Sequence, residues 1–226
     1  MFKRIAMTIA LAVAPATFAQ TYIVPGGDCG AVTFNVTRGG DFPNRGQAIN
    51  ADQVIDAYLY VPKQRVAVKL VNGEFDADVP GDAVVMAAVN LEPEIIGDET
   101  RTEHAKAFIF CGDKTPAADW QRSAGLGLEI YPQGWNGPRS QMKAGDTMRF
   151  IAVDQTTKKL IGDLPMELYR AGTGRIAEGV PAQHSGMNFP YPEPGWYMVV
   201  AKYRRPDPKQ PNHWLVDTST LTFEIK

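Results

Sequence analysis

The sequence predicts an all-β protein, with two tandem Ig-like β-sandwich domains that follow a cleaved signal peptide. Short runs in which apolar and polar residues alternate recur along the chain, and this is the pattern of half-buried strands. The 21 glycines and 17 prolines interrupt these runs at short intervals, as turns between strands do. Hydrophobic residues make up 44% of the chain, which is enough to build a packed core.

Residues 1–19 have the pattern of a secretory signal peptide. Lys3 and Arg4 precede an apolar run at residues 5–13, and small residues end at Ala19, where we expect cleavage. The apolar run is too short to cross a bilayer as a helix, and a buried N-terminal helix is the alternative. We therefore expect an exported, periplasmic protein and not an integral membrane protein.

The first domain is expected to span residues 20–122. Val32, Phe34 and Val36 alternate with polar residues and predict a strand. Residues 99–110 begin with helix formers and end with β formers, so we expect a short helical turn that leads into a strand. Further strands are predicted at residues 55–61, 65–71 and 83–91.

The second domain is expected to span residues 123–226. Leu126, Leu128 and Ile130 alternate with other residues, and a second run at 148–153 follows after a loop that is rich in glycine and proline. Further strands are predicted at residues 164–170, 196–203 and 219–225, which gives about the six or seven strands that an Ig-like sandwich needs.

Cys29 and Cys111 are the two cysteines of the chain. An even number of cysteines in an exported protein predicts a disulfide. The alternative is a pair of soft metal ligands, but no histidine or further cysteine stands at ligand spacing from either one.

Composition and motifs argue against two functional classes. Without Lys3 and Arg4 the chain has 21 basic residues (23 minus 2) against 25 acidic ones. The sequence also has no basic segment rich in aromatic residues, so we do not expect it to bind nucleic acid. The G-x-S-x-G, H-E-x-x-H, P-loop and C-x-x-C motifs are all absent, so we do not predict an enzyme. A hydrolase that uses two carboxylates is the most distant alternative.

Four residues are candidate metal ligands. His184 and Met187 are three residues apart in a glycine-containing loop, which suits a soft copper site or a plain turn. His104 follows Glu103, and His213 precedes Trp214. A solvated face and the start of a hairpin are the simpler interpretations of these two histidines.

Trp135 is the candidate contact residue. It lies between Gly134 and Asn136, so a loop should expose it. Exposed aromatic side chains of this kind indicate a binding module that grips a protein or a glycan without any metal, which is our second functional hypothesis.

Six short segments stand in a fixed order along the chain: residues 42–43 (FP), 103–107 (EHAKA), 127–132 (GLEIYP), 143–147 (KAGDT), 194–199 (PGWYMV) and 221–224 (LTFE). Taken together, they resemble the DUF4198 family of exported bacterial proteins. The resemblance covers nearly the whole mature chain and is strongest from Gly125 onwards. It implies a periplasmic, non-enzymatic component of nickel or cobalt uptake, with a receptor or transporter in the envelope as partner.

One position departs from the family pattern. Many members begin the mature chain with a histidine, whose amine and imidazole together suit Ni²⁺ or Cu²⁺. Gln20 stands at this place here. Its amide is a poor ligand, and an N-terminal glutamine can cyclise and lose its amine.

Overall fold

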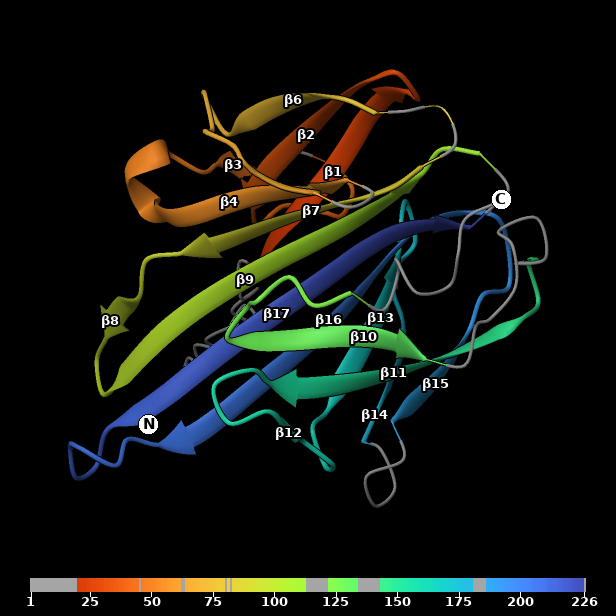
Figure 1. Ribbon diagram of the computed structural model, residues 1–226. Coiled ribbons are helices and arrows are strands. Elements are labelled where there is room, and N and C mark those ends of the chain that lie inside the picture. The colour runs from red at the N-terminus through yellow and green to blue at the C-terminus, as the bar shows by residue number, and fades with distance from the viewer. Residues whose placement is uncertain are drawn as a thin grey trace, which may run out of the picture.

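The computed structural model describes residues 20–44, 46–61, 64–79, 81, 83–112, 122–133, 143–180 and 186–225. Within these residues the regular secondary structure is β-strands and one turn of 3-10 helix at Ala51–Gln53, joined by turns and loops (Figure 1). The predicted all-β class is confirmed. No helix in the described ranges is long and apolar enough to cross a membrane. The predicted signal peptide lies outside the described residues.

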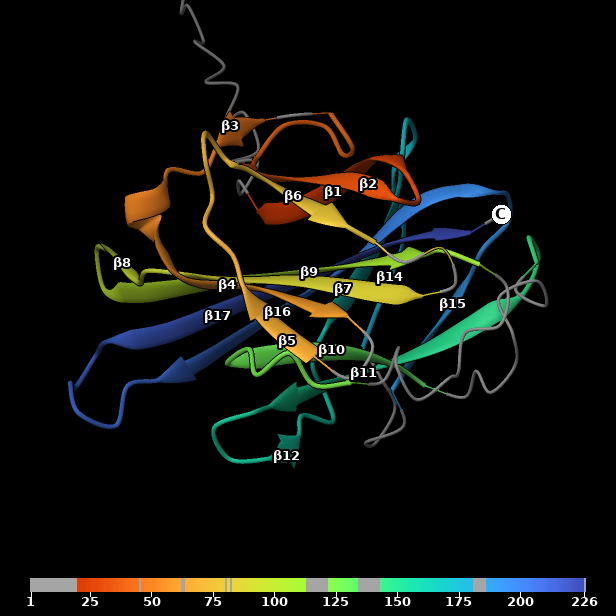
Figure 2. The same cartoon turned by 45° about the horizontal axis from the view of Figure 1, so that its top comes forward.

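The strands form three sheets that lie in layers (Figures 1 and 2). The N-terminal sheet contains β1 (Thr21–Asp28), β2 (Ala31–Arg38), β3 (Gln47–Ala48) and β6 (Glu74–Asp78). The third sheet contains β10 (Leu128–Gln133), β11 (Thr147–Asp154), β12 (Lys159–Leu160) and β15 (Met187–Pro190). The central sheet lies between them, in the order β14 (Gly174–Gly179), β13 (Met166–Arg170), β16 (Gly195–Pro206), β17 (Trp214–Ile225), β9 (Glu99–Phe110), β7 (Val84–Leu91), β4 (Val54–Val61) and β5 (Gln64–Ala67), with β8 (Glu94–Ile96) also paired to β9.

The central sheet takes strands from both halves of the sequence. β17 lies parallel to β9, with Trp214 opposite Glu99 and Thr222 opposite Ala107. The domain boundary predicted at residue 122 therefore falls between strands that share one sheet. The tandem Ig-like organisation stays a prediction.

Alternation along the strands sends side chains to the two faces of the central sheet. In β16, Tyr197 and Val199 enter the core that is shared with the third sheet, whereas Met198 and Val200 face the N-terminal sheet. The core towards the third sheet is rich in aromatic rings, and the rings of Tyr191 and Tyr197 meet edge to face at 5.0 Å. The two faces therefore have separate cores.

β9 corrects one sequence-based expectation. The helical turn predicted within residues 99–110 is wrong, because β9 is a continuous strand of 12 residues. It pairs with β7 on one side and with β17 on the other, so its backbone hydrogen bonds are made in the sheet. Pairing on both edges outweighs the weak helix propensity of its first residues.

The predicted disulfide between Cys29 and Cys111 is confirmed, with the two sulfur atoms 2.11 Å apart. Cys29 lies in the turn between β1 and β2, and Cys111 directly follows β9. The bond therefore ties the N-terminal sheet to the central sheet.

Candidate functional site

A cleft of about 1350 Å³ lies between the N-terminal sheet and the central sheet. The N-terminal sheet packs over β4, β7 and β9. Residues of β16 and β17 form the floor of the cleft, where Tyr22 and Phe42 pack against Met198 and Val200. One wall comes from β8, β9 and the end of β2, and the other comes from β13 and the start of β14. The lining residues are Gln20, Tyr22, Arg38, Gly39, Gly40, Asp41, Phe42, Asn44, Glu92, Glu94, Ile96, Arg101, Glu103, Pro165, Glu167, Tyr169, Gly172, Thr173, Gly174, Arg175, Met198, Val200, Lys202, Val216 and Thr218.

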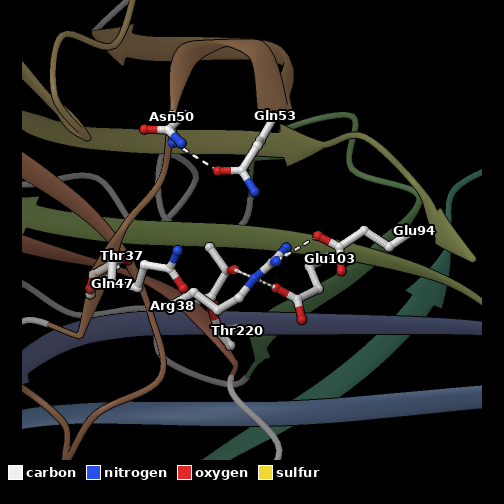
Figure 3. A network of polar contacts seen from close by, with 9 residues as sticks. Thr37, Arg38, Gln47, Asn50, Gln53, Glu94, Glu103 and Thr220 are labelled. Carbon is white, nitrogen blue, oxygen red and sulfur yellow. Dashed lines mark hydrogen bonds and ion pairs between the residues drawn. The ribbon is translucent and has the colours of Figure 1, made fainter. Parts of the chain in front are cut away.

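Arg38 organises the first wall. It ends β2, and its guanidinium lies between two carboxylates, 2.6 Å from Glu94 and 3.1 Å from Glu103 (Figure 3). Burial opposes the charge on Arg38, but the hydrogen bonds to both carboxylates outweigh burial and raise its pKa. The side chain of Arg38 is 16% exposed, whereas that of Glu94 is 43% exposed, so this group of charges meets solvent at the cleft.

Two threonines fix the position of this wall. The Thr21 hydroxyl donates a hydrogen bond to Glu103, and Nε of Arg38 donates to Thr21 at 3.3 Å. The hydroxyl of Thr220, on β17, donates to the carbonyl of Thr21 at 2.8 Å. Strand β1 is thereby held against the central sheet beside the cleft.

The second wall carries a similar group of charges. Arg175 lies 2.7 Å from Glu167 and 2.6 Å from Glu178. The hydroxyl of Tyr169 donates to Glu167 at 2.7 Å. Burial, and then the hydrogen bond to Glu167, raise the pKa of Tyr169 to about 12, so its hydroxyl keeps its proton at neutral pH and remains a donor.

The third-sheet face of the central sheet holds a second kind of charged pair. Lys106 and Glu129 are completely buried, with Nζ 2.8 Å from Oε1. The backbone N–H of Ala124 also donates to Glu129 at 2.6 Å, and Nζ of Lys106 lies 4.6 Å from the centre of the Tyr131 ring. This pair has no access to solvent and joins β9 to β10.

His104 lies on the same buried face. Its Nδ1 is 2.7 Å from Oδ1 of Asn90, and its Nε2 is 3.9 Å from Oδ1 of Asp217. Gly127 packs directly on the ring, because a Cβ at this glycine would lie 2.9 Å from Nε2. The close contact leaves no room for a larger residue at position 127.

The structure does not bring the candidate metal ligands together. His213 contacts Thr100 near the start of β9. The residue opposite His104 in β17 is Ser219, so the two histidines do not meet. Met187 lies on β15 in the third sheet. Within the described ranges, no three His, Cys, Asp or Glu side chains converge on a metal-sized site. His184 and the proposed contact residue Trp135 lie outside these ranges.

The residues that line the cleft were missed by sequence reasoning. Arg101 and Glu103 occupy alternate positions of β9, and the same face carries buried Ala105 and Ala107 further along the strand. This alternation could have predicted that charged side chains share one strand face with the core. The expectation of a helical turn at these residues excluded that interpretation.

The chain matches no family model and no curated protein. The resemblance to the DUF4198 family stays a prediction that rests on the order of its short motifs.

Proposed function

We propose that this chain is an exported, non-enzymatic binding protein whose cleft holds an extended segment of a partner molecule. The observation that supports the proposal most is the size and lining of the cleft. Its volume of about 1350 Å³ exceeds the range of about 300–1,000 Å³ that is usual for small-molecule pockets. A chain segment fills a site of this volume better than a metal ion or a single small ligand does.

The polar lining also favours binding over catalysis. Arg38 and Arg175 are each engaged by two carboxylates, and Tyr169 keeps its proton. These groups can donate and accept hydrogen bonds at fixed positions, which is what recognition requires. A nucleophile activated by a neighbouring base would instead favour an enzyme.

Export is supported by two features. The chain begins with the pattern of a signal peptide, and its cysteines are joined. Disulfides of this kind persist in oxidising compartments such as the bacterial periplasm. We place the protein there on this basis.

The nickel or cobalt role belongs to the same proposal only through the DUF4198 resemblance. A receptor or transporter of a metal-uptake system would then be the partner whose segment enters the cleft. Titration calorimetry with Ni²⁺ and Co²⁺ tests whether this chain itself binds the metal.

The role of the cleft is tested by selecting ligands and then blocking the cleft with a bulky side chain. The full chain is expressed with its own N-terminal segment, purified, immobilised and screened against a peptide display library and a glycan array. Thr218 lies on the cleft floor, and Thr147 lies exposed on β11 in the third sheet. We expect Thr218→Trp to abolish binding of the selected ligands and Thr147→Trp to preserve it. Ligands that bind both variants equally would refute a role for the cleft.

A further inference from the structure

The two walls of the cleft share one arrangement of charge. On the first wall, Arg38 lies between Glu94 and Glu103. On the second wall, Arg175 lies between Glu167 and Glu178, the last of which stands just outside the lining. Each Glu–Arg–Glu triad has two carboxylates and one guanidinium, so each carries a formal charge of −1.

We infer that the segment bound in the cleft is a peptide with basic side chains, which reach one Glu–Arg–Glu triad on each wall. This inference rests on the proposed function and adds the chemistry of the ligand. Clefts that are lined by an excess of one charge concentrate ligands of the opposite charge. Both triads are partly exposed, so a lysine or arginine can approach their carboxylates without breaking the ion pairs already present.

The spacing of the triads fits an extended peptide. Glu103 lies on β9 and Glu167 on β13, and the sheet order β9, β17, β16, β13 separates these strands by three steps. At about 4.8 Å a step, the strands lie roughly 14 Å apart. Glu103 is level with Lys202 and Glu167 is level with Val200, so the two glutamates are also offset by two residues, about 7 Å, and lie roughly 16 Å apart. An extended chain covers about 3.4 Å per residue, so residues four apart span about 14 Å, and long lysine side chains can cover the remainder.

Two further basic side chains line the cleft, Arg101 and Lys202. Arg101 pairs with Glu99 at 2.8 Å, and Glu99 lies outside the lining. With Asp41 and Glu92 counted, the lining holds five carboxylates against four basic groups, an excess of one negative charge. Lys202 projects from the floor, where Thr218 separates it from Glu103 in the sheet. A basic segment is repelled by Lys202, so Lys202→Gln should tighten binding of such a segment.

The probes are three fluorescently labelled ten-residue peptides in a serine–glycine background. They carry two lysines, two glutamates or two glutamines, each pair four residues apart. Fluorescence anisotropy measures Kd for the purified full chain at 0.05 M and 0.5 M NaCl. We expect the lysine peptide to bind most tightly and to weaken at high salt, because the Debye length falls to about 4 Å.

Charge removal locates the binding. Glu103→Gln and Glu167→Gln should each weaken binding of the lysine peptide roughly two- to fivefold, as for partly exposed ion pairs. Asp78→Asn removes the same charge from β6 in the N-terminal sheet and should leave Kd unchanged. Melting temperatures of all variants show whether they fold, and Glu167, the more exposed of the two glutamates, is the safer test.

The outcomes separate the two proposals. If the acidic or neutral peptide binds as tightly as the basic one and Thr218→Trp blocks it, the charge inference is wrong and the cleft still binds peptides. If the lysine peptide binds equally well to Thr218→Trp, its attraction is to the surface in general and the charge inference is wrong. The proposed function fails as well only if the ligands from the library screen also bind Thr218→Trp equally. If none of the peptides binds, the charge inference is refuted, while the library screen still decides the proposed function.

Discussion

Both faces of the central sheet carry cation–carboxylate pairs, but they surround these pairs differently. Towards the third sheet, Lys106 and Glu129 are completely buried among aromatic side chains. Towards the N-terminal sheet, Arg38 joins Glu94 and Glu103 at the edge of the cleft, where Glu94 remains 43% exposed. The two kinds of pair come from the same strand, since Glu103 and Lys106 lie three residues apart on β9 and point to opposite faces of the sheet.

The difference shows how burial decides what a charged pair can do. Burial opposes the charged form of Glu129, but Lys106 outweighs burial and holds the pKa of Glu129 below its usual range. Burial also lowers the pKa of Lys106. Both groups are completely buried, so neither can exchange its partner for a ligand, and this pair acts on the fold alone. The Arg38 group meets water and can exchange one contact for another, as a binding site must.

The largest effect is expected from breaking the buried pair on one side. Glu129→Leu leaves the ammonium of Lys106 buried without a counter-charge and should cost roughly 3–5 kcal/mol of unfolding free energy. Urea denaturation at pH 7 measures the loss. The double variant Lys106→Met with Glu129→Leu removes both charges and should recover most of the stability. A single variant within 1 kcal/mol of the parent would contradict the assigned role of the pair.

The next effect concerns the connection between the layers. Reduction of the Cys29–Cys111 bond, which links residues 82 apart in sequence, should cost about 2–4 kcal/mol. The N-terminal sheet has the smaller aromatic core and depends more on this bond. Hydrogen exchange should therefore rise in β1 and β2 before it rises in β10 and β11. Equal exchange in both layers would show that the disulfide stabilises the chain as a whole.

The class of the fold could be predicted from the sequence, because alternation is a local property. Val32, Phe34 and Val36 do form β2 with their side chains in a core, as their spacing predicts. The pairing of β17 with β9 joins residues more than 100 positions apart, and nothing in either strand specifies its partner. For this reason the shared central sheet was not predicted, whereas the strands in it were.

The site was less predictable than the fold. Sequence reasoning looked for histidines and loop aromatics, and it considered His104 because histidine is a common ligand. The structure buries His104 against Gly127 and builds the cleft from arginines and glutamates on strands instead. Arg38 and Glu103 are 65 residues apart and meet only because β1 and β2 fold over β9.

A smaller effect is expected at the cleft. Arg38→Met removes hydrogen bonds to two carboxylates and should cost roughly 1–2 kcal/mol, which is less than the loss at Glu129 because water can solvate Glu94 and Glu103. The matched change Arg175→Met, on the exposed second wall, should leave the midpoint of urea denaturation unchanged. If Arg38→Met were as damaging as Glu129→Leu, the Arg38 group would be a second structural pair and a poor binding wall.

The smallest effect concerns the response of the third-sheet face to acid. Burial raises the pKa of Asp217, but His104 and Arg205 outweigh burial and hold it below the usual value. A carboxylate with a lowered folded-state pKa contributes stability that is complete above its unfolded pKa of about 3.9, and the contribution is lost as the pH falls through the folded value. Asp217→Asn should therefore lower the unfolding free energy at pH 7 and show a smaller difference from the parent at pH 3.

Urea denaturation at both pH values measures this change, and Asp78→Asn at an exposed position of β6 is the control. A difference that stays constant from pH 7 to pH 3 would mean that the Asp217 side chain stabilises the protein by its shape and hydrogen bonds rather than by its charge. Asp217 and the Lys106–Glu129 pair would then stabilise this face in different ways, because the contribution of the pair depends on ionisation and that of Asp217 does not.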